Sequence, residues 1–400
     1  ERNLPNRRLA VVHGVPCRAI SPNMTRRNTI GLFYHGHLRD SHTMQYLQTL
    51  AARMALCLIA GTLLNADWSP ARGEEPAENL ADHYQWINVT PQAPFMPRDG
   101  AGALSYRGKM WLIGGWNPGQ LKLKCSNDVW SSPNGRDWTE VKPNTFLNSD
   151  FNATEDWEGR HTAGYAVFKD KMWIVGGDPL QGHYQSDIWN SENGKDWTLV
   201  LQEAPWGPRA LHYTVVHEGK LWVIGGQTMP AFAPAEEKFY RDVWNSEDGV
   251  HWTKLEPREP CWSPRGMIGG AAVLRGRIWI LGGGTYDTPM TKHRNFYNDV
   301  WSSADGITWT RHAESPPWKP RQYHEVAAFD GRLWVLEGWN QGNRNDVWAS
   351  ADGTNWQELP GTPWKPRHAS SVFGFQDALW MVAGNNFESD VWKLVRKSEK

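Results

Sequence analysis

Residues 276–283 read GRIWILGG, and residues 298–309 read NDVWSSADGITW. The first segment is rich in β-branched and aromatic residues and ends at a glycine pair, which predicts a strand that runs into a loop. The second segment predicts two short strands joined across Asp305-Gly306. Asp-Gly favours a type I′ hairpin turn, because that turn needs a positive φ at both central residues. We therefore expect three neighbouring strands in this stretch.

Similar sequence segments recur along the chain. In five copies a tryptophan before the turn and one after it are eight residues apart, at Trp130/Trp138, Trp189/Trp197, Trp244/Trp252, Trp301/Trp309 and Trp348/Trp356. Each glycine-rich strand follows another apolar segment that opens on an arginine, at Arg98, Arg160, Arg209, Arg265, Arg321 and Arg367. A unit that recurs in this way can bury its apolar face only against its neighbours. Four strands per unit predict the blade of a β-propeller.

The two ends of the repeat region predict how the ring of blades closes. The sixth unit ends at Trp392 without a fourth strand, whereas residues 84–89 (YQWINV) have the pattern of a fourth strand ahead of the first full unit. We expect this N-terminal strand to complete the last blade, because the pairing removes a sheet edge. The predicted fold is an all-β, six-bladed propeller over residues 82–396. Eighteen of the 26 tryptophans fall in three rings of six, where we expect them to pack between blades.

The repeats resemble those of the kelch-repeat family. The resemblance rests on Asn-Asp-Val-aromatic strands, on the spaced tryptophans, and on glycine doublets at Gly114-Gly115, Gly176-Gly177, Gly225-Gly226 and Gly282-Gly283. It departs from the family pattern at Glu337-Gly338 and Ala383-Gly384, where the doublet is degraded. It implies the propeller fold and little about activity, because one fold hosts many functions. The turn from Ser303 to Trp309 is also similar to the Asp box of sialidases, although it is one residue shorter.

The segment ahead of the repeats divides in two. Residues 1–43 are basic and loop-like, and we interpret them as an unstructured leader or as mis-assigned upstream sequence. Residues 44–73 have the pattern of a signal peptide, with an apolar run from Met54 to Leu64 and small residues before a cut after Gly73. A run of eleven apolar residues is too short to cross a bilayer. We therefore expect a secreted or periplasmic protein without an integral membrane segment in the mature chain; the alternative for the apolar run is a short buried helix.

Composition narrows the kinds of partner. A formal net charge of −1, without a run of basic residues in the repeats, argues against nucleic-acid binding. Of the four cysteines, only Cys125 and Cys261 follow the predicted signal peptide, and we expect two lone thiols rather than a disulfide framework. The sequence shows no metal-ligand spacing and no cofactor motif, so we expect neither a metal nor a cofactor.

The arginines that open the first strands are candidate ligand-binding residues. In a propeller the first strand lines the central channel, and the loops from fourth to first strand and from second to third strand open on the same face, here called the loop face. The six arginines lie on this face, with His161 and His368 directly after Arg160 and Arg367. A ring of arginines around a channel attracts anions. The same repetition would also arise if each arginine pairs with a neighbouring carbonyl or with the Asp of the NDVW-type strand.

Residues outside the repeat pattern are the other candidates for the ligand site. Trp116-Asn117 and Trp339-Asn340 directly follow the glycine-rich strands of the first and fifth units, at the mouth of long and unequal loops. The same loops carry His183, Tyr184, Phe232, Tyr240, Tyr286, His293, Phe296, Tyr297 and Phe387. Exposed aromatic rings beside amide and guanidinium groups suit a sugar ring, and they suit a protein partner equally well.

Two classes of function follow. The first is a non-catalytic, secreted propeller that binds a carbohydrate or a protein through its loop face. The second is a sugar epimerase or mutarotase, since kelch enzymes include the periplasmic N-acetylneuraminate epimerase, and its acid, base and anion-binding groups would come from Glu325, His324, His212 and Arg321. Adjacent Glu325 and His324 point to opposite faces of a strand, so only one can face the channel. A copper site of the galactose-oxidase type, the third alternative, lacks a cysteine in a first strand.

Overall fold

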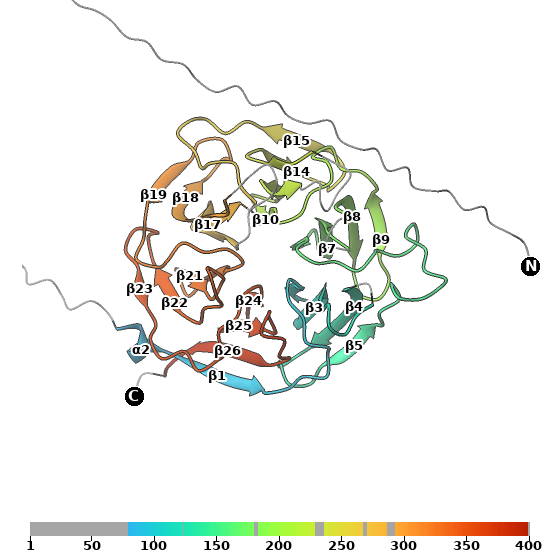
Figure 1. Ribbon diagram of the computed structural model, residues 1–400, viewed down its shortest axis with the longest axis horizontal. Helices are drawn as coiled ribbons and strands as arrows, with labels where there is room; N and C mark the ends of the chain where they lie inside the picture. Colours follow the sequence, from blue (N-terminus) through green and yellow to red (C-terminus); the bar gives the residue numbers. More distant parts are fainter. Residues whose placement is uncertain are drawn as a thin grey trace, which may run out of the picture. The chain divides into compact units, whose positions relative to one another are not determined.

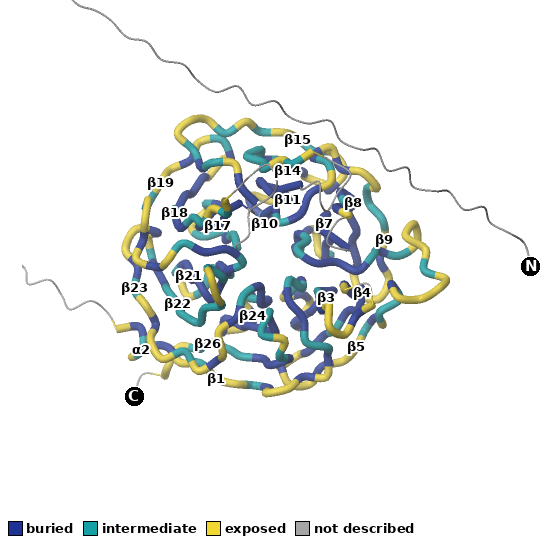
Figure 2. Tube along the Cα trace, in the orientation of Figure 1, coloured by how far each residue is buried: buried dark blue, intermediate teal, exposed yellow. Residues whose placement is uncertain are grey.

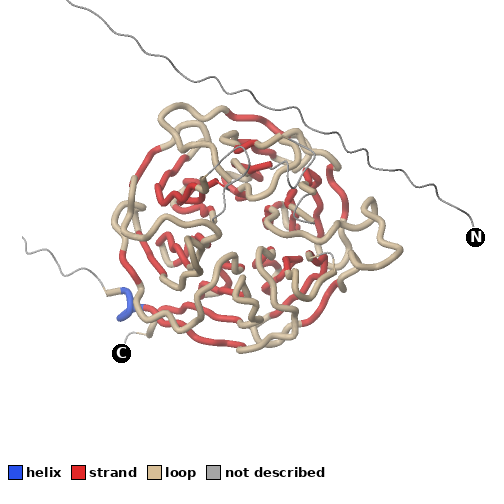
Figure 3. Tube along the Cα trace, viewed as in Figure 1, coloured by secondary structure: helices blue, strands red, loops and turns tan. Residues whose placement is uncertain are grey.

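The computed structural model describes residues 79–122, 124–179, 183–228, 236–266, 270–285 and 293–398. The predicted leader (1–43) and signal peptide (44–73) therefore lie outside the described residues. The described part is almost entirely strand and loop, with one short helix, α2 (Leu80–His83), ahead of the first strand (Figure 3). Its strands form six four-stranded antiparallel sheets arranged as blades around a central axis (Figure 1). The prediction of a six-bladed propeller is confirmed.

Each blade runs from an inner first strand to an outer fourth strand. Blades 1 and 2 contain β2 (Gly102–Tyr106), β3 (Lys109–Trp116), β4 (Cys125–Ser132) and β5 (Thr139–Lys142), then β6 (Gly164–Phe168), β7 (Lys171–Gly177), β8 (Gln185–Ser191) and β9 (Thr198–Leu201). Blades 3 and 4 contain β10 (Tyr213–His217), β11 (Lys220–Ile224), β14 (Val243–Ser246) and β15 (Trp252–Leu255), then β16 (Ala271–Leu274), β17 (Arg277–Thr285), β18 (Asn295–Ser303) and β19 (Thr310–Ala313). The second-to-third-strand loop of blade 3 adds a small hairpin, β12 (Gln227–Thr228) and β13 (Lys238–Phe239).

The last two blades differ in how their outer strands arise. Blade 5 contains β20 (Glu325–Phe329), β21 (Arg332–Leu336), β22 (Val347–Ser350) and β23 (Gln357–Glu358). Blade 6 contains β24 (Ser371–Phe375), β25 (Ala378–Val382) and β26 (Val391–Arg396), and its fourth strand is β1 (Tyr84–Thr90). In that pair Tyr84 lies opposite Arg396 and Trp86 lies opposite Leu394. The predicted closure by the N-terminal strand is confirmed, and it ties the two ends of the repeat region into one sheet.

Tryptophans join each blade to its neighbour. One apolar cluster combines Trp111 and Ile113 of blade 1 with Trp157, Met172 and Trp189 of blade 2, and all five side chains are buried. The second-strand indole N–H groups donate to the backbone carbonyl five residues earlier, as in Trp111 to Tyr106 at 3.0 Å. Such a bond offsets the cost of burying the indole N–H, although the Trp157 N–H in the same cluster has no partner among the described residues. Exposure is accordingly concentrated along the outer edge of the ring (Figure 2).

The prediction of a type I′ turn at Asp305-Gly306 is wrong. β18 ends at Ser303 and β19 begins at Thr310, and of the two central residues only Gly306 has a positive φ, +73°. Instead, Ser303 Oγ accepts a hydrogen bond from the Gly306 N–H at 2.9 Å, and Asp305 Oδ1 accepts one from the Ile307 N–H at 2.8 Å. Glycine is also required there by packing, because a Cβ would lie 2.5 Å from the ring of Trp222 in the preceding blade. Hydrogen bonds from backbone N–H groups to side chains therefore hold this loop, which is longer than the predicted tight hairpin turn.

Turns with a positive φ at both central residues occur instead between the first and second strands of a blade. Asp330 and Gly331 have φ values of +49° and +69°, and Glu218 and Gly219 have +49° and +70°. These turns lie on the face opposite the loop face. The hairpin chemistry of the repeat was thus predicted at the wrong junction.

Candidate functional site

The six repeated arginines lie inside the blades. Their side chains are between 0% and 2% exposed. Each guanidinium pairs with an aspartate in, or directly before, the third strand of the same blade, at N–O distances of 2.5 to 2.7 Å: Arg98–Asp128, Arg160–Asp187, Arg209–Asp242, Arg265–Asp299, Arg321–Asp346 and Arg367–Asp390. In blade 2, Arg160 Nη1 also donates to the Gly176 carbonyl at 3.0 Å, and Arg160 Nε donates to the Glu158 carbonyl at 3.0 Å.

This bonding leaves little of any guanidinium group for a ligand. The aspartates accept a further hydrogen bond from the third-strand indole, as in Trp130 Nε1 to Asp128 at 2.7 Å. Burial alone would raise the pKa of Asp128, but the charge and hydrogen bonds of Arg98 outweigh it and hold the pKa below its usual value. The sequence left open that each arginine pairs with a carbonyl or with the NDVW-type aspartate. In the structure each arginine pairs with both.

The residues that follow these arginines meet those that follow the glycine doublets. Isolated β-bridges join Asp99 to Trp116, His161 to Asp178, Ala210 to Gln227, Gly266 to Gly284, and Gln322 to Trp339. In blade 6 the equivalent contact is the Asn385 N–H donating to the His368 carbonyl at 2.8 Å. These positions form a circle on the loop face, which we call the rim. The rim varies from blade to blade while the strands below it repeat, so it is the candidate binding surface.

One aromatic cluster on the rim surrounds Trp116. Its ring lies 5.8 Å from the imidazole of His161 and 6.0 Å from the ring of Phe387, measured between centroids. The Phe387 side chain is 39% exposed, which makes it one of the few large apolar side chains on the surface of the described chain. Trp116, His161 and Phe387 come from blades 1, 2 and 6, so the cluster spans three blades.

His161 lies between two buried carboxylates. Its Nδ1 is 3.0 Å from Asp178 Oδ1, and its Nε2 is 3.5 Å from Asp99 Oδ1. Asn385 Nδ2 donates to the other oxygen of Asp99 at 2.6 Å. Burial lowers the pKa of His161, but the carboxylate of Asp178 more than offsets this and the pKa is raised. Burial raises the pKa of Asp99 to about 6. This network fixes the imidazole against Trp116.

A second aromatic cluster surrounds Trp339, the equivalent residue of blade 5. The ring of Phe296 lies 5.6 Å from the Trp339 ring, and the guanidinium of Arg294 lies 4.8 Å from its centroid. A cation over an indole face is a favourable arrangement. Trp116 and Trp339 are both half-buried, with part of each side chain reaching solvent. Phe232 and Tyr286, two further aromatics of the predicted loops, lie outside the described residues.

Asn117 and Asn340, the predicted ligand-binding residues that follow the two tryptophans, are hydrogen-bonded to the backbone. Asn117 Nδ2 donates to the Pro97 carbonyl at 2.7 Å, and Asn340 Nδ2 makes the same bond to Pro320 at 2.7 Å. His368 Nδ1 lies 2.7 Å from Asn343 Oδ1, and its ring lies 5.0 Å from that of Tyr323. The two asparagines therefore hold the start of each loop in place. The sequence predicted ligand binding for them and did not predict this structural role.

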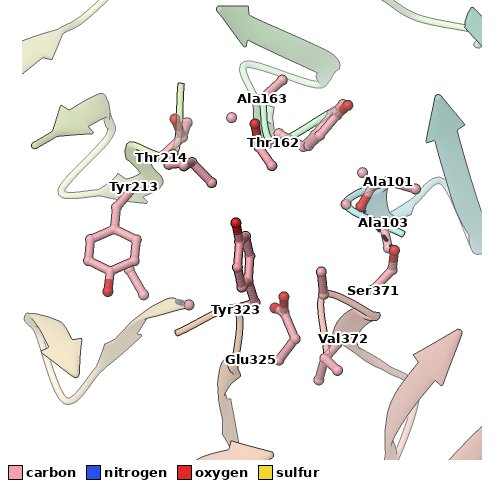
Figure 4. Close-up of a pocket in the computed structure, with 18 of the residues that line it drawn as sticks. Ala101, Ala103, Thr162, Ala163, Tyr213, Thr214, Tyr323, Glu325, Ser371 and Val372 are labelled. Carbon is pink, nitrogen blue, oxygen red and sulfur yellow. Dashed lines mark hydrogen bonds between the residues drawn. The ribbon is translucent and has the colours of Figure 1, made fainter. Parts of the chain in front are cut away.

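Below the rim the central channel contains a cavity of about 230 Å³. The inner strands line it with small residues such as Ala103 and Ser371, and the side chains of Tyr323 and Glu325 project into it from blade 5 (Figure 4). Burial, followed by the charge of nearby Glu337, raises the pKa of Glu325 well above its usual value. The sequence did not single out Glu337 as a site residue, although it interrupts a glycine doublet.

The four residues of the enzyme alternative do not converge. Glu325 and His212 line the cavity, whereas His324 is buried with its Nε2 at 2.9 Å from the Leu281 carbonyl. Burial lowers the pKa of both histidines to about 3, so each imidazole is neutral. Arg321 is bonded to Asp346 within its blade. As expected from strand geometry, only one of the adjacent pair Glu325 and His324 faces the channel.

Among the described residues, no group of three or more His, Cys, Asp or Glu side chains is arranged to hold a metal ion. Cys125 is buried, Cys261 is half-buried, and both are free thiols. The described part of the chain also has no helix with the length and apolar character that a membrane span requires.

Comparison with known proteins finds similarity at low identity. Alpha-scruin and beta-scruin of Limulus polyphemus are 25% and 24% identical to this chain over 280 and 260 residues, which cover 65% and 61% of it. The leucine-zipper-like transcriptional regulator 1 homolog of Drosophila melanogaster is 23% identical over 213 residues, or 49% of this chain. The matched regions make up 26%, 25% and 19% of these proteins, so the chain spans about a quarter or less of their length. No family model matches the sequence.

Proposed function

The chain belongs to the kelch-repeat β-propeller family, and from that membership we propose that it is a protein-binding module whose rim receives the partner. The observation that carries the proposal is the pair of aromatic clusters around Trp116 and Trp339. Neither cluster belongs to the repeated core, because the equivalent positions of the other blades carry Asp178, Gln227, Gly284 and Asn385. The scaffold does not need these aromatic rings.

Protein fits the rim better than carbohydrate does. A bound sugar needs planar polar groups beside an aromatic face, and the amides of Asn117 and Asn340 already donate to proline carbonyls. The repeated arginines are also bonded within their blades. The half-buried rings of Trp116 and Trp339 remain accessible, the second with the guanidinium of Arg294 over its face, and aromatic side chains are typical anchors of protein interfaces. A rigid ring of six blades presents these anchors with little loss of conformational entropy on binding.

Removing the aromatic anchors should weaken the partner complex and leave the fold intact. We expect the double variant Trp116→Ala/Phe387→Ala to lose roughly tenfold or more in affinity for the partner, with the same direction for Trp339→Ala. Affinity capture from source-cell extract with the full chain, read by quantitative mass spectrometry, identifies the partner and allows titration of each variant. Circular dichroism and the unfolding midpoint should stay close to wild type.

Val250→Ala is the matched control for this experiment. Val250 is 40% exposed, close to the exposure of Phe387, and lies in a third-to-fourth-strand loop on the opposite face. It should retain every protein that the wild type captures. The same captured set from the rim variants, or saturable binding to a panel of free sugars instead, would contradict a protein-binding rim.

The cellular location is a separate part of the proposal. We propose that residues 44–73 direct export and are removed, on the strength of the basic residue, apolar run and small residues of that segment. Expression of the full chain in bacteria should give a mature protein that begins at Glu74 in the periplasm or medium. N-terminal sequencing of the fractionated protein checks this, and an uncleaved chain confined to the cytosol would contradict it.

A further inference from the structure

The channel below the rim has an acidic group that the blades do not require. Glu325 is the first residue of its inner strand, and the equivalent first residues in blades 1, 2, 3 and 6 are Gly102, Gly164, Tyr213 and Ser371. None of these is an acid. Glu325 forms no hydrogen bond or ion pair with the described residues, unlike the paired aspartates inside the blades. Glu325 is half-buried and lines the cavity without a counter-charge, so its carboxyl group is available to a ligand of opposite charge.

No basic side chain lines the cavity within the described chain. The ionisable residues that face it besides Glu325 are His212, Tyr165, Tyr213 and Tyr323. His212 is neutral, because burial lowers its pKa to about 3. Burial also raises the pKa values of Tyr165 and Tyr213, which keeps both phenols uncharged. Glu337, buried behind Glu325, adds a second acid rather than a counter-charge. The local field of the channel therefore favours a cation.

Aromatic and hydroxyl groups complete the environment of this carboxyl. Figure 4 shows the Tyr323 ring beside Glu325 in the middle of the cavity, with Thr162 and Thr214 on the wall across from them. Tyr323 has a φ of +55°, a left-handed conformation that Thr162 (+54°) shares at the equivalent position in blade 2. The Oγ1 atoms of Thr162 and Thr214 are buried and have no hydrogen-bond partner. Both hydroxyl oxygens are closed off from the cavity, and the half-buried Glu325 and Tyr323 are the groups that face it.

We propose that the channel binds a primary alkylammonium group, held by the Glu325 carboxylate and the face of Tyr323. An ammonium group combines a positive charge with N–H donors, and both match the carboxylate. The aromatic face adds a cation–π contact. The cavity volume of about 230 Å³ accommodates a short alkyl chain and leaves no room for a folded partner. This site is distinct from the rim and does not depend on the protein-binding function.

Titration calorimetry with n-butylammonium chloride and the full chain near neutral pH tests the proposal. The neutral isostere is 1-butanol, and sodium chloride at the same ionic strength is the salt control. We expect n-butylammonium to bind with a Kd of about 1 mM or tighter, and the alcohol to bind at least about tenfold more weakly. Because the bound cation favours the ionised carboxyl, binding should also release protons, seen as a heat that depends on the ionisation enthalpy of the buffer.

Variants locate the site. Glu325→Gln should weaken n-butylammonium binding about tenfold or more and abolish the proton release, and it should fold, since it changes an unpaired, half-buried side chain that faces the channel. Glu155→Gln, which changes an exposed carboxylate outside the channel, should bind as wild type does. Trp116→Ala should also bind n-butylammonium normally, which separates this site from the rim. Undiminished binding to Glu325→Gln, equal binding of the alcohol, or no binding up to about 10 mM would overturn the proposal.

Discussion

Replacing Arg160 with methionine is expected to lower the free energy of unfolding by about 3 to 5 kcal/mol. The substitution leaves the Asp187 carboxylate, 5% exposed, without the cation 2.5 Å away. It also removes the donor to the Gly176 carbonyl. An uncompensated buried charge is the most costly consequence, and the same pair recurs in every blade. Urea denaturation followed by tryptophan fluorescence measures the change.

Two further variants separate the buried charge from a general effect of losing an arginine. Arg107→Met removes an exposed pair with Asp170, whose side chains are 49% and 73% exposed, and should leave the denaturation midpoint nearly unchanged. Arg160→Met combined with Asp187→Leu should recover part of the loss, because no unpaired charge remains. A single variant as stable as wild type would mean that the arginine ring does not hold the blades together.

Glu337→Gln should make the protein more stable at alkaline pH. Burial raises the pKa of Glu337 from 4.5 to about 7, so between these values the folded state binds more protons than the unfolded state. Stability is therefore lost as pH rises through that window, and the loss is complete above it. The variant has no proton to lose and should be about 3 kcal/mol more stable than wild type at about pH 8, with little difference at about pH 4.

The glutamine can keep the bond that the glutamate makes. Glu337 Oε1 accepts a hydrogen bond from the Ser370 N–H at 2.9 Å, and an amide oxygen can accept the same bond. Urea midpoints over this pH range give the comparison, with Glu140→Gln as the control at an exposed carboxylate. A variant whose stability follows the same pH profile as wild type would show that the charge of Glu337 is stabilised in the fold.

The ring of blades could be predicted from the sequence because the same residues recur at regular spacing in every blade. Trp pairs eight residues apart and arginine-opened segments fixed the strands, and the unpaired ends fixed the closure seen between β1 and β26. The Asp-Gly turn was predicted wrongly because local turn propensity contains no information on contacts with the neighbouring blade. Gly306 is placed against Trp222, a residue more than eighty positions away in sequence, and Ser303 replaces the backbone bond of a tight turn.

The site was less predictable than the scaffold. Repetition of an arginine in six blades suits either an anion ring or an internal pair, and only the positions of Asp128 and its counterparts decide between them. Trp116 and Trp339 could be selected because they fall outside the repeat, but their neighbours Phe387 and Phe296 arrive from other parts of the chain. Which residues line the channel depends on the side of the inner strand that each one faces. Residue spacing does not predict this side for Tyr323, because its positive φ breaks the regular alternation of a strand.

A photo-reactive amino acid in place of Phe387 tests the protein-binding rim most directly. The full chain with p-benzoylphenylalanine at this position, or at Val250 on the opposite face, is illuminated in source-cell extract and its adducts are identified by mass spectrometry. The predicted result is a discrete protein adduct at Phe387 that is absent at Val250 and is outcompeted by unlabelled wild type but not by Trp116→Ala/Trp339→Ala. No adduct at Phe387, or the same adducts at both positions, would contradict the assignment of the rim as the binding surface.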